Sequence, residues 1–380
     1  MTLYQKIIKV LRYFRLFGIS RTLSKIYLVY HNRSSKDFEG DILVVNKSNK
    51  KRSSIAIIGC GSFAFSNICF FLYKKNKKYL RYALDIDKSK ALSLCKTYNG
   101  YAAIDNFQYI LDDEQVKLVY IASNHSTHAE YAIKCLAKNK SVHIEKPHAI
   151  NKDQLERLIS AAKKSSGNLY LGFNRPKSQL AKKAIKELES EDGPLSLNFF
   201  VVGHKLDADH WYFSSNEGGR VLGNLCHWTD LCLHLLEKNK DIFPCKIQSI
   251  VGDDPNSNFI VSAVFNDGSL ATFNFSAKGY SFEGVKEFIQ IHKGKLLMNL
   301  RDFQKLEGWK MDKIIKHNLF FRNQGHNANI LNSYKGIDKI NQGEDLQYIF
   351  NTGYFMLKIK ESLDTGEEVI CNPIKVHNMQ

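Results

Sequence analysis

Three small residues follow a short apolar run and could bind phosphate groups. Residues 54–58 have the β-branched composition of a strand buried on both faces, and Gly59, Gly61 and Ala64 come directly after them. Gly59 would permit a tight turn, Gly61 a close approach of the backbone, and Ala64 close packing of the helix predicted over 65–73. The N–H groups at the start of that helix would hold a pyrophosphate. The residues expected to contact it are Gly59, Gly61, Ser62, Phe63 and Ala64.

An acidic residue stands about twenty residues further on, where the next predicted strand ends. Residues 82–84 are apolar and are followed directly by Asp85. A carboxylate in this place would accept hydrogen bonds from the hydroxyls of an adenosine ribose and would repel a 2′-phosphate. The pattern therefore predicts a dinucleotide cofactor, NAD in preference to NADP. The alternative is that Asp85 caps a helix that starts near Lys88, although Asp87 could do this instead.

The composition limits the class of protein. A chain of 380 residues with 44% hydrophobic residues has room for two globular domains and their cores. The eight cysteines are scattered without metal-ligand spacing, which predicts reduced, buried thiols, a cytoplasmic protein and no metal site. No secretory signal is evident, and the uncharged run over 53–73 contains too many Gly, Ser and Asn residues for a membrane span.

The net charge of +16 is concentrated near the N-terminus. Residues 1–52 contain twelve Lys or Arg residues against three Asp or Glu residues. Apolar side chains recur at helical spacing over 4–17 with basic residues between them, which predicts a basic amphipathic helix. Residues 1–30 would then attach to an acidic membrane surface or to a partner enzyme, or the helix would pack on its own domain. No nucleic-acid-binding motif is present, and we expect no such partner.

The order of the predicted elements indicates two different domains. Strands and helices alternate from residue 54 onward, which predicts a parallel, Rossmann-type sheet. After about residue 190, long strand-like runs dominate, and Asn266-Asp267-Gly268 marks a hairpin. We therefore expect the α/β class with an α+β C-terminal domain. The predicted segments are 1–52, a basic extension and linker; 53–175, a Rossmann NAD(P)-binding domain; and 176–380, an α+β substrate-binding and oligomerisation domain with a large, mainly antiparallel sheet.

Polar residues follow two further strands of the predicted nucleotide domain. Because open α/β sheets bind ligands at the carboxyl ends of their strands, these side chains could reach the cofactor. They are Ser123, Asn124, His125 and His128 after the strand predicted over 116–121, and Glu145 and Lys146 after the strand predicted over 141–144.

With these motifs the chain resembles the Gfo/Idh/MocA family, named for glucose–fructose oxidoreductase and inositol dehydrogenase. The resemblance covers about residues 54–365 and includes Gly172-Phe173-Asn174-Arg175 and Gly218-Gly219. It implies an oxidoreductase in which the lysine of Glu-Lys-Pro, here Lys146, lies between cofactor and sugar. An ammonium group there can hydrogen-bond a substrate hydroxyl and oppose charge on its oxygen. The alternative for Lys146 is an ordinary surface lysine.

The family also has an Asp-x-x-x-His pattern on the helix that enters its second domain. Here the histidine is His227, but Gly223 stands in place of the aspartate. An aspartate at position 223 would share a helix face with His227, because side chains four residues apart lie on the same side of a helix. The chain therefore lacks a group that could position the substrate hydroxyl. His227 becomes the candidate general base, since imidazole can take a proton near neutral pH. Its alternative is a hydrogen-bonded core histidine, and Asp230 is expected to be structural.

Residues 210–231 resemble a branch of the family found in surface-polysaccharide gene sets, in which glycine at position 223 is normal. Asn174, Arg175 and Arg220 could bind a sugar hydroxyl or a phosphate, or form salt bridges at a domain interface. His210 and Trp211 could form a wall on which a sugar stacks, although Trp211 could equally belong to the core. The residues expected to bind substrate are Asn174, Arg175, His210, Trp211, Arg220 and His227.

The resemblance leads us to expect an NAD(P)-dependent oxidoreductase of a sugar or nucleotide-sugar, active in polysaccharide or glycan metabolism. In this hypothesis Lys146 and His227 hold one hydroxyl, and His227 takes its proton as hydride leaves for the nicotinamide. Two alternatives remain open: an inactive NAD-binding assembly subunit docked through residues 1–30, and a non-redox member that retains NAD. We also expect a homo-oligomer formed through the C-terminal sheet.

Overall fold

The computed structural model of the protein describes residues 2–236, 241–254, 256–278 and 284–379. The chain forms two compact units whose sequences interleave. The nucleotide unit contains 19–172, 327–349 and Met379, and the sheet unit contains 1–18, 173–326 and 350–378. The predicted change of domain near residue 175 therefore appears at Phe173, but the predicted N-terminal segment 1–52 is divided between the units.

The nucleotide unit is built on a sheet in the order β1-β4-β3-β2-β5-β6-β7 over the described residues. The strands from β2 to β7 pair in parallel, as predicted, whereas β1 pairs antiparallel to β4. From β2 the chain adds β3 and then β4 on one side, and it places β5 on the other side. Ligands of open α/β sheets bind at the point where the strand order reverses in this way. The strands are β1 (Ile42–Val44), β2 (Ile55–Ile58), β3 (Leu80–Leu84), β4 (Ala102–Ile104), β5 (Leu118–Ile121), β6 (Ser141–Ile144) and β7 (Leu169–Leu171).

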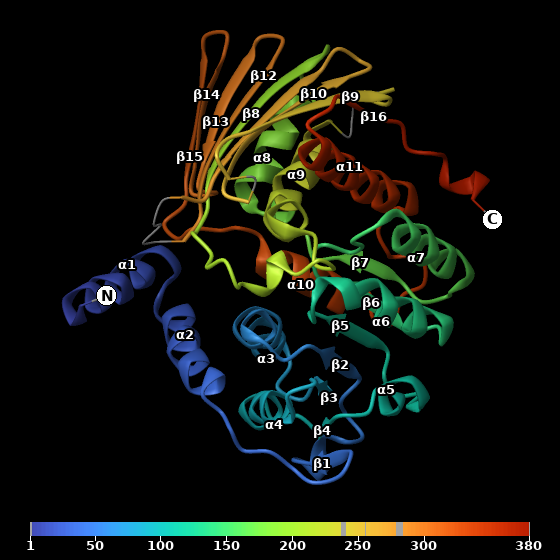
Figure 1. The fold of residues 1–380 in the computed structure, drawn as a ribbon. Helices are drawn as coiled ribbons and strands as arrows, with labels where there is room; N and C mark the ends of the chain where they lie inside the picture. The colour runs from blue at the N-terminus through green and yellow to red at the C-terminus, as the bar shows by residue number, and fades with distance from the viewer. Residues whose placement is uncertain (1, 237–240, 255, 279–283, 380) are drawn as a thin grey trace. The chain divides into compact units, whose positions relative to one another are not determined.

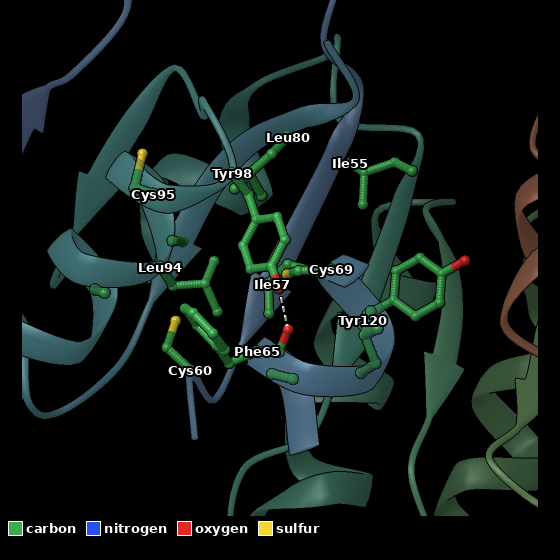
Figure 2. Packing of buried hydrophobic residues seen from close by; sticks show 14 of the residues in the cluster. Ile55, Ile57, Cys60, Phe65, Cys69, Leu80, Leu94, Cys95, Tyr98 and Tyr120 are labelled. Atoms are coloured by element: carbon green, nitrogen blue, oxygen red, sulfur yellow. Dashed lines mark hydrogen bonds between the residues drawn. The ribbon is translucent and has the colours of Figure 1, made fainter. Parts of the chain in front are cut away.

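The helix after β2 begins with wide π-type turns, η2 (Ala64–Cys69), and continues as α3 (Phe70–Lys75). Its first residues are held by the core shown in Figure 2, where the Tyr98 hydroxyl donates to the Phe65 carbonyl at 2.5 Å. All six residues of η2 are buried, which fixes the start of this helix against the sheet. The other helices assigned to this unit are α2 (Ile19–Asn32), α4 (Lys88–Thr97), α5 (Gln108–Asp112), α6 (His125–Ala137), α7 (Lys152–Lys164) and α10 (His326–Lys335).

The sheet unit carries a large and mainly antiparallel sheet, as predicted, with β8 and β11 as its parallel pair among the described strands. Buried and exposed residues alternate along β8, so one face is covered and the other is open. Figure 1 shows α8, α9 and α11 together on one face. In sheet order the strands are β15 (Lys313–Asn318), β14 (Lys305–Lys310), β13 (Leu296–Arg301), β12 (Lys286–Lys293), β8 (Leu195–Val202), β11 (Leu270–Ser276), β10 (Asn258–Phe265), β9 (Cys245–Val251) and β16 (Val369–Cys371). The helices are α1 (Leu3–Phe17), α8 (Gln179–Leu188), α9 (Cys226–Leu236) and α11 (Leu346–Thr365).

The N-terminal segment differs from the predicted extension and linker. Gly18 adopts a φ of +79° and separates α1 from α2, because a left-handed conformation ends a helix. The second helix begins at Ile19, and Ile42–Val44 continues the chain into the parallel sheet as an edge strand. The segment is therefore part of both units rather than an appendage to one.

All eight cysteines are buried free thiols, which confirms that part of the prediction. Burial raises the pKa of the Cys69 thiol to about 12, so it stays protonated at neutral pH. Within the described residues, no helix has both the length and the apolar character needed to cross a bilayer.

The loop after β6 is joined to the returning segment 327–349 by a buried histidine. His148 is fully buried and its Nε2 lies 3.1 Å from the Ile349 carbonyl oxygen. Burial lowers the pKa of His148 to about 4. The imidazole is therefore neutral at pH 7, with the Nε2–H donating to Ile349.

Acidification should destabilise the nucleotide unit through His148. The unfolded chain takes up a proton near pH 6.5 and the folded chain only near pH 4, so the unfolding free energy should fall by about 2 kcal/mol between pH 7 and pH 5. His148→Gln keeps an N–H donor but does not titrate, and should remove that share of the pH dependence. Urea unfolding followed by circular dichroism at both pH values measures it. Equal pH dependence of the wild type and the variant would contradict a neutral buried His148.

Candidate cofactor and substrate residues

The turn after β2 can contain only glycine at position 59. Gly59 has a φ of +83°, and a Cβ there would lie 2.4 Å from the Ala122 carbonyl oxygen and 2.5 Å from the Ser123 nitrogen. Gly61, in contrast, has no atom within 4 Å of the place its Cβ would occupy. The turn thus presses against the loop after β5 at Gly59 and stays open at Gly61, as a phosphate-binding turn requires.

Asp85 is bound to the same turn. Its Oδ2 accepts from the Cys60 N–H at 2.6 Å and its Oδ1 from the Asp87 N–H at 2.9 Å. Asp87 is the N-cap of α4 and accepts from the Ser89 N–H at 3.0 Å, so the helix-cap alternative for Asp85 is wrong. Because a carboxylate oxygen can accept more than one hydrogen bond, both oxygens of Asp85 keep capacity for a ribose hydroxyl.

His128 links two loops and is not placed as a cofactor ligand. Its Nδ1 lies 2.8 Å from the Pro147 carbonyl oxygen and its Nε2 lies 3.0 Å from that of Ser123. Burial lowers the pKa of His128, so the neutral ring donates to one of these carbonyls at a time. His125 is buried at the start of α6, whereas Asn124 beside it is exposed.

Lys146 follows a buried polar residue that has little freedom to move. The carboxyl group of Glu145 lies where a Cβ on Gly172 would be, with Oε1 2.8 Å from that position. The His143 Nε2 is 3.7 Å from Glu145 Oε1, and its Nδ1 is 3.0 Å from Ser333 Oγ. The Lys146–Pro147 peptide bond is cis. These contacts fix the backbone from which the Lys146 side chain projects.

A set of α2 residues that no sequence motif indicates binds the turn and the helix after it. The His31 Nε2 lies 2.7 Å from the Cys60 carbonyl oxygen, and its ring stacks on Phe65 with centroids 4.2 Å apart. Arg21 donates to the Ser66 carbonyl and to Asn67 Oδ1, and the Lys25 Nζ lies 3.0 Å from Ser66 Oγ. Nothing in the sequence of these residues indicates what they cover.

Burial changes the protonation of the α2 residues. It lowers the pKa of Lys25 to about 8, with a smaller contribution from the charge of Arg21. It also lowers the pKa of His31, whose neutral ring can donate to Cys60 from Nε2 and accept from Ser93 Oγ at Nδ1, 2.9 Å away. These contacts hold the glycine turn from the side of α2.

The sheet unit places Asn174 and Arg175 in its interior, where other residues of the unit bind them. Both are buried. The Arg175 Nε donates to Glu287 Oε2 at 2.7 Å, and its guanidinium carbon lies 4.5 Å from the centre of the Trp228 ring. Asn174 donates to the Gln324 carbonyl at 2.6 Å. Arg175 thus forms a buried ion pair with Glu287 within the sheet unit, and substrate binding by either residue stays a prediction.

Arg220 lies beside a cavity of about 120 Å³ within the sheet unit. Its guanidinium donates to Asn224 Oδ1 at 2.9 Å and to the His204 carbonyl. Burial lowers the pKa of Arg220 and that of His210. The residues that line the cavity are Gly203, His204, Leu206, His210, Tyr212, Arg220, Asn224, Trp228, Phe275 and Val285.

Trp211 is 39% exposed and therefore does not belong to the core. Its ring stacks near His210 with centroids 5.8 Å apart and meets Tyr212 edge-on at 4.5 Å. This aromatic cluster, His210–Phe213, has the surface character expected of a wall for a sugar ring.

His227 lies at the start of α9, half-buried, with its ring edge-on to Phe173 at 6.1 Å. The residues before it form η5 (Val221–Leu225), which has π-type turns. Positions 223 and 227 are therefore not aligned on one helix face in the way that residues four apart are in a regular α-helix. Asp230 is completely buried and accepts from the Thr352 hydroxyl at 3.4 Å, a structural position as expected.

A comparison with protein-family models finds a match within the nucleotide unit. Residues 53–173 match the GFO_IDH_MocA model, described as an oxidoreductase family with an NAD-binding Rossmann fold. Residues 53–173 thus match the Gfo/Idh/MocA family. The match confirms the predicted family and the predicted NAD-binding Rossmann domain.

Curated relatives are similar over part of their length. The chain is 25% identical to oxidoreductase P35 of Formosa agariphila over 160 residues, 42% of this chain and 47% of that protein. It is 33% identical to myo-inositol 2-dehydrogenase of Thermotoga maritima over 81 residues, 21% of this chain and 24% of that protein. The matched region thus spans less than half the length of these relatives.

Solved structures extend the similarity of fold to most of the chain. Levoglucosan dehydrogenase in complex with NADH has a TM-score of 0.72 at 15% identity and covers 85% of this chain and all of that one. GenD2 from gentamicin A biosynthesis, in complex with NAD, has a TM-score of 0.69 at 16% identity, with 89% and 100% covered. These similarities establish the fold of both units.

Removing the His31 side chain should weaken cofactor binding because the glycine turn loses its support from α2. His31→Ala should raise the Kd for NAD about tenfold, the loss expected for one or two net hydrogen bonds. Isothermal titration of NAD measures it. Tyr30→Ala, an exposed neighbour on the same helix, should bind NAD as the wild type does. An unchanged Kd in folded His31→Ala would show that α2 does not position the turn.

Proposed function

We propose that the protein is an NAD(P)-dependent oxidoreductase that transfers hydride between a nicotinamide and a hydroxyl or keto carbon of a sugar or nucleotide-sugar. The observation that carries the proposal is the glycine turn at Gly59–Gly61 bound to Asp85 in a domain of this family. Asp85 supports NAD over NADP, because its carboxylate would repel a 2′-phosphate. When bound, the nicotinamide would supply the hydride chemistry.

The residues proposed to act on the substrate are Lys146 and His227. Lys146 follows the rigid Glu145 and would hydrogen-bond the reacting hydroxyl, opposing the negative charge that develops on its oxygen. His227 would take or return the hydroxyl proton. Both roles rest on the family resemblance and on the chemistry of these side chains.

Sugar chemistry is supported by the relatives and by the aromatic cluster. The named relatives include an inositol dehydrogenase and a levoglucosan dehydrogenase. Arg220 and His210, which line the cavity of the sheet unit, and the exposed Trp211 are the proposed substrate contacts. A role in polysaccharide or glycan metabolism is supported by the resemblance of residues 210–231 alone.

Gly223 supports a second candidate, an NAD-binding member without redox turnover. The position has no side chain, and its carbonyl accepts from the Tyr212 hydroxyl at 3.5 Å. Such a protein would serve as an assembly subunit or would retain its NAD through a non-redox reaction. Retention of NAD through purification without net NADH formation on any sugar would favour this candidate.

Two partner contacts are also proposals. The open face of the large sheet exposes apolar residues such as Phe200, Ile260 and Trp309, which supports a homo-oligomer. Residues 1–30 are proposed to contact a membrane or a partner enzyme.

Lys146→Ala should abolish most turnover while leaving cofactor binding intact. Loss of one preorganised donor at the reacting oxygen should lower kcat by about 10²–10³-fold. NADH formation with a panel of sugars and inositols measures kcat, and isothermal titration measures the Kd for NAD. The matched control is Lys152→Ala, an exposed lysine that pairs with Glu156. Turnover by Lys146→Ala near the wild-type rate would refute the proposed role.

A further inference from the structure

Helix α1 presents its apolar stripe to solvent. Leu3, Ile7, Val10, Leu11 and Phe14 recur at helical spacing along one side, and each is between 45% and 75% exposed. No residue of the helix is fully buried, although Ile8, Tyr13, Leu16 and Phe17 on its other side are half-buried. A helix of 15 residues with so little tertiary support is marginal in water, which suggests that something else covers this stripe.

The apolar surface continues at the C-terminal end of α1. The Arg322 N–H donates to the Leu16 carbonyl at 2.8 Å, which places residues 320–322 beside the end of the helix. Phe320 and Phe321 are 84% and 45% exposed there, with ring centroids 4.8 Å apart. We call this surface the N-terminal patch. It consists of Leu3, Tyr4, Ile7, Val10, Leu11, Phe14, Phe320 and Phe321.

The charge around the N-terminal patch has one sign. Helix α1 carries Lys6, Lys9, Arg12 and Arg15 and no acidic residue, and no Asp or Glu occurs before Asp37. On a helical wheel Lys6 and Arg15 flank the apolar stripe. Basic side chains in that position can reach lipid phosphates when a helix lies in the plane of a membrane surface with its apolar side inward.

We propose that the N-terminal patch binds an anionic lipid surface, with α1 lying in the interface. A second copy of the chain is a poorer occupant, because pairing two patches would bring two sets of like charges together. A neutral apolar groove on another protein would offer no opposite charge to the four basic residues of α1. The proposal does not depend on the proposed catalytic function, because no residue of the patch belongs to the cofactor or substrate set.

Vesicle sedimentation of the full chain tests the proposal. The protein should sediment with vesicles of phosphatidylcholine and phosphatidylserine in about a 70:30 ratio, remain in solution with phosphatidylcholine alone, and be released by about 0.5 M NaCl. Ile7→Ser with Phe14→Ser should reduce the bound fraction about tenfold or more, and Lys6→Gln with Arg15→Gln about fivefold. All variants should bind NAD with the affinity of the wild type. A failure of the membrane proposal can therefore be told apart from a failure of the proposed oxidoreductase function.

Matched controls remove similar residues elsewhere. Ile250→Ser with Ile340→Ser replaces two isoleucines that are 65% and 73% exposed, and Lys152→Gln with Lys313→Gln replaces two exposed lysines. Both controls should sediment as the wild type does. Equal losses in the controls, or equal binding to neutral and anionic vesicles, would overturn the proposal. Failure to bind vesicles together with a dimer that Ile7→Ser and Phe14→Ser abolish would assign the patch to a second copy.

Discussion

The close approach of the glycine turn to the loop after β5 is the constraint on which the nucleotide unit depends. The missing side chain of Gly59 lets the end of β2 lie against Ala122 and Ser123, where any Cβ would collide with backbone atoms. The strand order also reverses here, so the close packing at Gly59 lies at the point where open α/β sheets bind their ligands. From there the Cys60 N–H donates to Asp85, and the His128 ring lies between the carbonyl oxygens of Ser123 and Pro147. A change at Gly59 would therefore disturb the candidate ribose, phosphate and lysine positions together.

A buried carboxylate has a comparable role in the sheet unit. Glu287 is completely buried and accepts from Arg175, Trp228 and Gln324. Removing one partner would leave a buried charge without its full set of donors, which is costly. These residues connect the entry to α8, helix α9 and strand β12, so the ion pair organises the interior beneath the sheet. Arg220 and His210 at the cavity and the exposed Trp211 remain the proposed substrate contacts.

The sequence predicts those structural features that depend on residues close together along the chain. Gly59, Gly61 and Asp85 belong to a strand–turn–helix–strand pattern whose geometry is local, and the structure has this turn with Asp85 bound to it. Arg175 and Glu287 lie 112 residues apart, and no local pattern tells a buried ion pair from a substrate ligand. His31 lies on α2, and its contact with Cys60 depends on tertiary packing. The hairpin β14–β15 lacks a clear alternation of apolar and polar residues, because Gly308 is buried whereas Trp309 and Ile314 are exposed.

The most direct test of the account is the affinity of NAD for the wild type, Gly59→Ala and Gly40→Ala, measured by isothermal titration. Both glycines have positive φ values, +83° and +71°, so both substitutions strain the backbone, but the place of a Cβ on Gly40 is open. The account predicts that the wild type and Gly40→Ala bind NAD alike and more tightly than NADP, and that Gly59→Ala binds at least about 30-fold more weakly, because its turn must move away from Ala122. Wild-type affinity in Gly59→Ala, or no binding of either nucleotide by the wild type, would contradict the assignment of the cofactor site.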